Sequence, residues 1–216
     1  IEDVPDEHAA DLIEGLSAAD AATIIEEMES DEQADLLAEV EPPELADILD
    51  SLPADVAADA QALMAYEPHS AGGLMIREFL AYPPDADASA VIADIMEPQL
   101  DVPRSALQFA LVVDPGERLL GAVRVRDLLG RPGGTPLDAV RQTATVVNVD
   151  ADLDILRECF DEEEESLALP VTADDGKLVG VLLRRDVEES LVDRSEEDRL
   201  KSSGIVGGEE LRTMPV

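Results

Sequence analysis

The chain has 216 residues, enough for one large domain or two small ones with a substantial core. Its 51 Asp and Glu residues against 15 Lys and Arg give a net charge of -36, which repels phosphodiester backbones and excludes nucleic acid as an expected partner. No apolar run of about 18 residues suggests a membrane span, so we expect a soluble chain. The single cysteine, Cys159, excludes an internal disulfide framework and is expected to pack in the core.

The acidity has two physical interpretations. Carboxylates at this density either keep a protein hydrated at high salt or supply hard oxygen ligands for divalent cations. Only two lysines, Lys177 and Lys201, accompany the acids, which favours a halophilic contribution. Acidity by itself therefore does not identify an ion site.

The first third of the chain repeats every 12 residues. In each strong copy the apolar residues fall at positions i, i+1 and i+4, which is one face of a two-turn helix. Such short helices are unstable alone, so we expect them to stack into an all-helical superhelix with an acidic outer face. The copies are AADLIEGL from Ala9, AATIIEEM from Ala21, QADLLAEV from Gln33, LADILDSL from Leu45 and a weaker AADAQALM from Ala57. Caps and breakers separate them at Ser17, Ser30, Pro42, Pro43 and Pro53.

Short β-branched runs dominate after Met75 and indicate strands. The expected strands are FLAY, ALVVD, LLGAVRV, TVVNV, LALPVT and LVGVLL. A second repeat appears when VVDPGERLLGAVRVRDLL is aligned with VTADDGKLVGVLLRRDVE. Each copy predicts a strand, a polar turn, a strand opening on Gly121 or Gly180, and an aspartate, Asp127 or Asp186, as a helix N-cap. The stretch GRPGGTP joins the two modules.

These tandem copies resemble paired CBS domains, whose glycine-to-aspartate spacing is met by GAVRVRD and GVLLRRD. With the helical repeats, the joint YEPHSAGGLM and the tail EEDRLKSSGIVGGEELRTMPV, the order resembles the cytosolic region of the MgtE family of magnesium channels. The resemblance implies an α+β multidomain fold, an all-α superhelical N domain followed by a tandem CBS pair of β-α-β-β-α units and the start of a connecting helix. The implied ranges are 1–68 for the N domain, 69–134 and 135–190 for the two CBS domains, and 191–216 for the connecting helix and pre-membrane segment.

The joint YEPHSAGGLM has three interpretations. A phosphate loop is disfavoured because its two glycines lack the spacing of such loops and no lysine is near. A metal site at His69 is disfavoured because the resemblance places an acid there and Mg²⁺ prefers oxygen ligands. We therefore predict a hinge at Pro68, Gly72 and Gly73.

The resemblance implies a homodimeric Mg²⁺ sensor, dimerised through the CBS pair, at the cytoplasmic face of the cell membrane. It further implies that the chain's own transmembrane domain follows Val216 in the natural protein. Several weak Mg²⁺ sites would favour a compact state with the pore closed. The implied metal ligands are Glu44, Asp47, Asp152, Asp154, Glu165, Asp186, Glu189, Glu197 and Asp198. Each is also open to interpretation as solvated surface, and Arg194 and Pro43 stand where the family has acids.

The second hypothesis is a standalone CBS-pair module that senses ATP or another adenine nucleotide. Nucleotide-binding CBS domains usually have a hydroxyl residue three positions before the aspartate, where this chain has Arg124 and Leu183. Asp127 and Asp186 could still hold a ribose. A third hypothesis is structural assembly with a purely halophilic surface. An enzyme is not expected, because His8, His69 and Cys159 lie in separate segments and no catalytic motif accompanies them.

Overall fold

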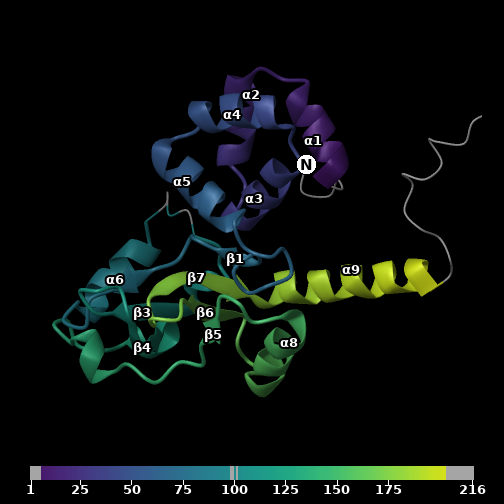
Figure 1. Cartoon of the computed structure of the whole chain (residues 1–216). Helices are drawn as coiled ribbons and strands as arrows, with labels where there is room; N and C mark the ends of the chain where they lie inside the picture. Colours follow the sequence, from purple (N-terminus) through teal and green to yellow (C-terminus); the bar gives the residue numbers. More distant parts are fainter. Residues whose placement is uncertain (1–5, 98–99, 101, 203–216) are drawn as a thin grey trace, which may run out of the picture.

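The computed structural model describes residues 6–97, 100 and 102–202, without the side chains of 6, 7, 197, 198 and 200–202. A helical N domain sits on a pair of α/β units, from which a long helix, α9 (Arg184–Ser202), projects (Figure 1). Among the described helices, none combines the length and apolar character that crossing a membrane would require.

The N domain consists of five short helices that start every 12 residues or nearly so, which confirms the predicted repeat. They are α1 (Asp6–Glu14), α2 (Ala18–Glu26), α3 (Ser30–Ala38), α4 (Pro42–Ser51) and α5 (Ala54–Leu63). Ser17 caps α2 by accepting the Asp20 amide at 3.2 Å, and Pro42 opens α4. Ile13, Ile25 and Leu37 fill the apolar seam between the helices. Helices α3 and α5 lie nearest the α/β units, and α2 and α4 lie on the opposite side (Figure 1).

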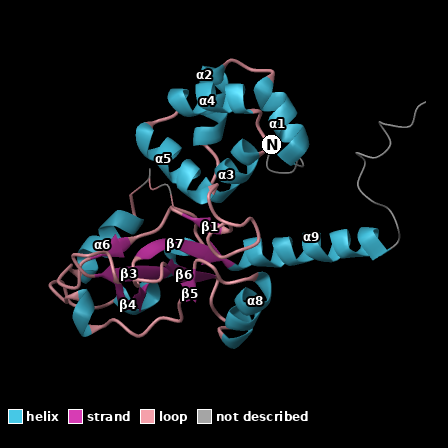
Figure 2. Ribbon diagram, in the orientation of Figure 1, coloured by secondary structure: helices cyan, strands magenta, loops and turns pink. Residues whose placement is uncertain are grey.

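The α/β part contains two sheets, shown in magenta in Figure 2. The three-stranded sheet has the order β2 (Ala81–Tyr82), β3 (Phe109–Val113), β4 (Leu119–Arg124). The four-stranded sheet has the order β1 (Met75–Ile76), β7 (Leu178–Leu183), β6 (Ala168–Thr172), β5 (Val147–Asn148). The associated helices are α6 (Ala88–Ile95), η1 (Ala106–Gln108), α7 (Val125–Leu128), η2 (Leu137–Ala139) and α8 (Leu153–Glu162). The predicted α+β fold, a helical domain followed by two similar α/β units, is confirmed.

The sheets divide the chain differently from the predicted ranges. Strand β1 pairs antiparallel with β7, with Met75 opposite Leu182, so it belongs to the second unit although it precedes the first. Conversely, Leu137 is buried in the core of the first unit, and Gln142 exchanges backbone hydrogen bonds with Ala122. Pairing and burial, rather than the Pro/Gly stretch, therefore set the boundaries.

Three predicted caps are wrong. Ser30 is the first residue of α3, whose N-cap is Glu29. Asp127 lies inside α7, whose N-cap is Arg124, and Asp186 lies in the first turn of α9. Helix α9 begins at Arg184 rather than near residue 191, because it continues directly from β7. Asp186 is thereby placed on the connecting helix itself.

The joint after α5 is anchored in the second unit. The amides of Ala71 and Gly72 donate to the carbonyls of Ala151 and Val149 at 2.9 and 2.8 Å. A Cβ at Gly72 would overlap the Tyr66 ring, and neither Gly72 nor Gly73 has a positive φ. Close packing, rather than unusual dihedrals, therefore requires these glycines, and of the three predicted hinge residues Pro68 alone is exposed.

Candidate cation-binding cavity

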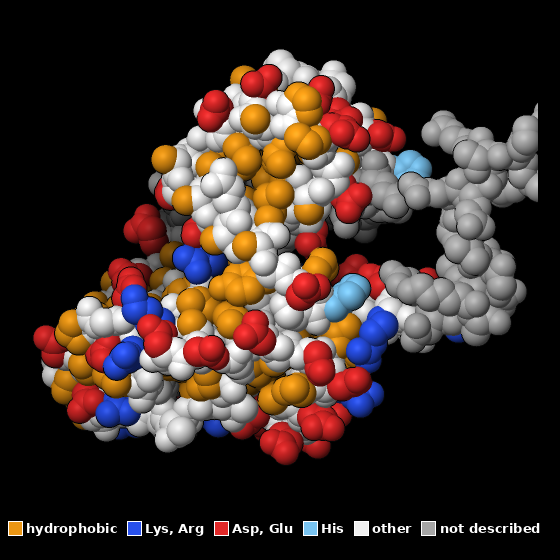
Figure 3. All heavy atoms as spheres, in the orientation of Figure 1, with side chains coloured by type: hydrophobic (Ala, Val, Ile, Leu, Met, Phe, Trp, Pro, Cys, Tyr) orange, Lys and Arg blue, Asp and Glu red, His pale blue; other side chains and the backbone are white. Residues whose placement is uncertain are grey.

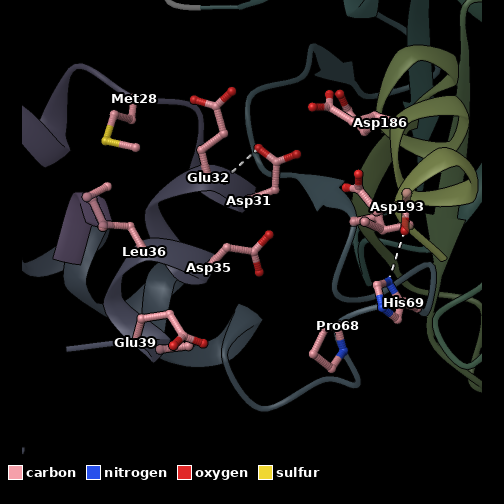
Figure 4. Close-up of a pocket in the computed structure, with 15 residues that line it drawn as sticks. Met28, Asp31, Glu32, Asp35, Leu36, Glu39, Pro68, His69, Asp186 and Asp193 are labelled. Atoms are coloured by element: carbon pink, nitrogen blue, oxygen red, sulfur yellow. Dashed lines mark hydrogen bonds between the residues drawn. The ribbon is translucent and has the colours of Figure 1, made fainter. Parts of the chain in front are cut away.

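A cavity of about 360 Å³ lies where α3, the joint at residues 68–69 and α9 meet. Carboxylates from α3 point toward carboxylates on α9 across it (Figure 4). Helical spacing explains this: Asp31 and Asp35 are four residues apart on α3, as are Glu189 and Asp193 on α9, so each pair shares a helix face. No Lys or Arg lines the cavity within the described residues. The acidic lining residues are Asp31, Glu32, Asp35, Glu39, Asp186, Glu189 and Asp193.

Asp31 is the most enclosed of these acids, with 7% of its surface exposed. Its Oδ1 accepts the Glu32 amide at 2.9 Å. The pKa of Asp31 is raised to about 8, mainly by burial and secondly by the negative charge of Asp186. At neutral pH, and without a counter-cation, this carboxyl group is therefore mostly protonated.

Asp186 faces Asp31 from α9 and is also perturbed. Burial raises the pKa of Asp186 to about 6, although the neighbouring Arg185 opposes the shift. Arg185 Nε donates to Asp186 Oδ1 at 2.9 Å. The other oxygen, Oδ2, is buried and has no hydrogen-bond partner among the described residues. A buried carboxylate oxygen without a partner is costly, so this atom favours a proton or a cation beside it.

The edges of the cavity carry contacts between the N domain and the rest of the chain. Arg185 forms an ion pair with Glu29, the residue that precedes α3. At the joint, His69 Nδ1 lies 2.9 Å from Ser190 Oγ on α9. These contacts hold the two acidic faces opposite each other.

The lining suits a hydrated divalent cation better than a directly coordinated one. Among the described residues, no three His, Cys, Asp or Glu side chains come close enough together to hold one ion. Mg²⁺ gives up its water shell reluctantly and commonly binds through one or two carboxylates and several waters. The cavity volume leaves room for such waters.

The structure brings together only part of the predicted metal set. Asp186 and Glu189 line the cavity. Glu44 and Asp47 are exposed on α4, which packs on α2 away from the cavity. Glu197 and Asp198 fall within α9, but their side chains lie outside the described part of the chain.

The other three predicted ligands have protein partners. Asp152 caps α8 by accepting the amides of Asp154 and Ile155 at 3.1 and 3.0 Å. Asp154 pairs with Arg194 at 2.9 Å, and the hydrogen bond from that guanidinium is the main reason that its pKa is lowered. Glu165 is exposed, 3.9 Å from an Arg126 nitrogen.

Sequence reasoning missed the α3 side of the cavity. Asp31, Glu32 and Asp35 lie on α3 and Glu39 directly follows it, so these acids recur at helical spacing on one face. The repeat pattern could have indicated that face. It could not show that α3, rather than α4, lies against α9.

A second hollow lies between the two α/β units. One part, about 200 Å³, is lined by Gln108, Phe109, Arg124, Val125, Arg126, Glu163, Glu165 and Ser166. An adjoining part of about 110 Å³ shares four of these residues and adds Thr143 and Thr145. Asp127, predicted as a nucleotide ligand, lines neither part. Asp186 lines the cavity beneath the N domain instead.

Comparison with known protein families agrees with this architecture. The model of the MgtE intracellular N domain matches residues 1–69, and the CBS-domain model matches residues 138–193. These two matches place an MgtE-type N domain before a CBS domain in this chain. Neither matching domain is a catalytic domain, in agreement with the sequence-based expectation that the chain is not an enzyme.

Individual relatives extend the match to MgtE proteins. The magnesium transporter MgtE of Thermus thermophilus is 27% identical over 157 residues, covering 72% of this chain and 34% of the relative. The crystal structure of the soluble part of a magnesium transporter superposes with a TM-score of 0.77 at 24% identity, covering 86% of this chain and 72% of that one. The crystal structure of the cytosolic domain of the Mg²⁺ channel MgtE in complex with ATP superposes with a TM-score of 0.71 at 27% identity. The match covers 86% of this chain and 80% of that one. The chain spans about a third of the length of the curated relatives that it matches.

Proposed function

We propose that this chain is the cytosolic Mg²⁺-sensing region of a magnesium transporter or channel. The observation that carries the proposal is the cavity between α3 and α9, where Asp31 and Asp186 face each other with raised pKa values and Asp186 Oδ2 has no partner among the described residues. The match to the MgtE intracellular N domain and the similarity to magnesium transporters support the choice of Mg²⁺.

The regulatory principle is electrostatic. Two unit charges of like sign 4 Å apart repel by about 4 kcal/mol at an effective dielectric constant near 20. Ionised carboxylates on α3 and α9 therefore push the N domain away from the connecting helix. When bound, a hydrated Mg²⁺ would supply the positive charge that makes the docked arrangement favourable. Because α9 continues toward the proposed transmembrane domain, docking of the N domain is the signal for a closed pore.

The cavity acids are the principal proposed site, with Asp31, Asp186, Glu189 and Asp193 at its centre. Asp152, Asp154 and Glu165 on the second CBS domain stay secondary proposals, as do Glu197 and Asp198 on α9. Glu44 and Asp47 are exposed on α4 and do not line the cavity. The Arg194 guanidinium beside Asp154 already neutralises one of these acids, so fewer ions are expected than the full predicted set would suggest.

The test is a titration of the chain with Mg²⁺, followed by small-angle X-ray scattering and calorimetry at constant ionic strength. Millimolar Mg²⁺ is expected to bind and to reduce the radius of gyration, and Asp186→Asn and Asp31→Asn are expected to weaken binding several-fold. Asp47→Asn, an exposed acid on α4, is the matched control and should bind as the original chain does. If KCl at equal ionic strength compacts the chain as fully as Mg²⁺ does, the halophilic hypothesis replaces this one.

A second candidate function is adenine-nucleotide binding in the cleft between the CBS domains. There the Phe109 ring could stack on a base, and the Arg124 and Arg126 guanidinium groups could hold phosphates. A structural neighbour was crystallised in complex with ATP. Calorimetry with ATP, with Arg124→Gln as the variant, tests this function. A standalone nucleotide sensor predicts ATP-driven compaction without a response to Mg²⁺ alone.

We also propose that the chain forms a homodimer through its CBS pair and acts at the cytoplasmic face of the membrane, attached to its own transmembrane domain. Met96 and Leu129 are 75% and 67% exposed on the first CBS domain, and exposed apolar side chains of this size favour an interface. Light scattering after size exclusion should give twice the 23.1 kDa chain mass, and Met96→Asp should reduce it.

A further inference from the structure

The first helix of the N domain exposes apolar side chains at positions that later repeats bury. Leu12 and Leu16, one turn apart on α1, are 61% and 44% exposed. The residues at the same two positions of the third repeat, Leu36 and Val40, are 1% and 5% exposed. In the second repeat, these two positions are half-buried. The apolar seam of the superhelix therefore reaches the surface at α1.

The place of α1 in the stack explains this exposure. Helix α1 packs on α3, and α3 packs in turn on α5, so α1 stands at the end of this row of helices (Figure 1). Ala9 and Ile13 bury the inner side of α1. In stacked helical repeats the terminal unit usually carries a polar outer face, but here two leucines stay exposed at helical spacing. The end of the row therefore suits one more helix.

The surface around these leucines is acidic. Residues 1–76 include 21 Asp and Glu and no Lys or Arg, and Asp11, next to Leu12, is exposed. In the space-filling view, hydrophobic side chains lie across the N domain with carboxylates around them, and the visible Lys and Arg side chains lie over the α/β units and α9 (Figure 3). Such a surface repels acidic proteins and anionic lipids and attracts cationic groups.

The two leucines have no role in the fold or in the proposed Mg²⁺ site. Neither one lines the cation-binding cavity, and neither belongs to the apolar core of the N domain. An exposed apolar patch with a polar rim is typical of a protein interaction site. What such a partner must look like follows from the shape and the charge of this surface.

We propose that the α1 face, defined by Leu12 and Leu16 with Asp11 at its edge, binds an amphipathic α-helix of a partner protein that carries Lys or Arg beside its apolar residues. The seam favours a helix, because the same repeat positions hold helices together inside the N domain, and a helix presents apolar side chains at matching spacing. The acidic rim favours basic flanks. A second copy of α1 would place acids against acids and fits less well.

The test is fluorescence anisotropy of a labelled probe peptide titrated with the whole chain in EDTA. The probe is a Leu/Lys peptide of about 18 residues, long enough to form a helix, with its leucines on one helix face. Two comparison peptides are used, one of the same composition in scrambled order and one with Glu in place of Lys. The amphipathic Leu/Lys peptide should bind at least about tenfold more tightly than the scrambled one, and the Leu/Glu peptide should not bind.

Variants of the chain locate the binding. Leu12→Ser combined with Leu16→Ser should weaken binding of the Leu/Lys peptide about tenfold. Leu167→Ser is the matched control, since this leucine of the second α/β unit is 49% exposed, and it should leave binding unchanged. Asp11→Lys should weaken binding more than Asp47→Lys, which makes the same change of net charge on α4. Circular dichroism checks that each variant folds.

Several outcomes would overturn the proposal. Absent binding of the Leu/Lys peptide would do so, and equal binding of the scrambled peptide or unchanged binding by the double serine variant would show only a general attraction to an acidic chain. A lower mass of that variant in light scattering would make the α1 face a contact between copies. A clear gain in affinity on removal of residues 1–5 would show that this segment covers the face. Because peptide binding is measured without a divalent ion, its failure would leave the proposed Mg²⁺ response untouched.

Discussion

Replacement of Asp31 by asparagine is expected to stabilise the chain in EDTA at neutral and alkaline pH. The side chain is buried beside Asp186 and must carry a proton to be tolerated there. Asparagine has nearly the same shape, keeps an oxygen for the Glu32 amide and needs no proton. The substitution therefore removes a cost of folding without leaving a hole.

The magnitude follows from the pKa. A carboxyl group that is ionised in the unfolded chain at its ordinary pKa of 3.8 and protonated in the folded chain up to about pH 8 takes up a proton on folding. At pH 7 that uptake costs about 4 kcal/mol, since each pH unit corresponds to about 1.4 kcal/mol. The pKa of Asp31 is higher in the folded chain than in the unfolded chain. The stability that this group contributes is therefore fully present below pH 3.8 and is lost as pH rises to about 8. Structural relaxation around the buried carboxyl group reduces the expected gain in the free energy of unfolding of Asp31→Asn to about 1–4 kcal/mol.

Urea denaturation followed by circular dichroism at pH 5, 7 and 8.5 measures this effect. The original chain should lose stability as pH rises, and Asp31→Asn should show a clearly flatter profile, with its largest advantage at pH 8.5. Asp47→Asn should change stability by less than about 0.5 kcal/mol. The reasoning is refuted if Asp31→Asn is less stable than the original chain at pH 8.5, or if its pH profile has the original slope.

Three further predictions concern the joint, the second CBS domain and the cavity. Gly73→Ala should lower the free energy of unfolding by about 1–3 kcal/mol, because the added Cβ would overlap the Glu67 carbonyl. Gly133→Ala, which has open space around it, is the control and should change stability little. Equal effects of the two substitutions in thermal denaturation would contradict the close packing at Gly73. Arg184→Lys should lower the free energy of unfolding, measured by urea denaturation, by about 1–3 kcal/mol. The Arg184 guanidinium lies 4.8 Å from the centre of the Phe160 ring and donates to several backbone carbonyls, and a lysine cannot make both kinds of contact. An unchanged urea midpoint would contradict this prediction. Mg²⁺ binding at pH 7 should release protons, which calorimetry in buffers of different ionisation enthalpy measures. The Asp31→Asn variant should lose most of that proton release. If the variant releases as many protons as the original chain, the protons come from groups other than Asp31.

The order of structural elements could be predicted from the sequence because each has a local signal. The 12-residue apolar pattern around Ile13 and Ile25 gives five helices, and the β-branched runs give strands. Pairing between distant segments has no such signal. The two-residue strand at Met75 pairs with a strand more than 100 positions later, so sequence reasoning assigned it to the nearer module.

The candidate site was predictable only on the side of α9. Asp186 and Glu189 follow a recognisable motif, whereas Asp31 is one acid among 21 in the first 76 residues. Its burial depends on how α3 docks against the CBS pair, which tertiary contacts decide. The same contacts place Glu44 and Asp47 on the outer side, although their spacing resembles that of ligands.

The pairing of β1 with β7 determines which piece of this chain can be cut out and still behave well. The stretch that the CBS-domain model matches, residues 138–193, contains β5, β6 and β7 but not Met75 or Ile76. A fragment with those ends would leave β7, an apolar strand, with a bare edge open to the next molecule, a common route to aggregation. Supplying residues 70–76 as a separate peptide should cover that edge, and fragment studies of the CBS pair should therefore begin before Ser70.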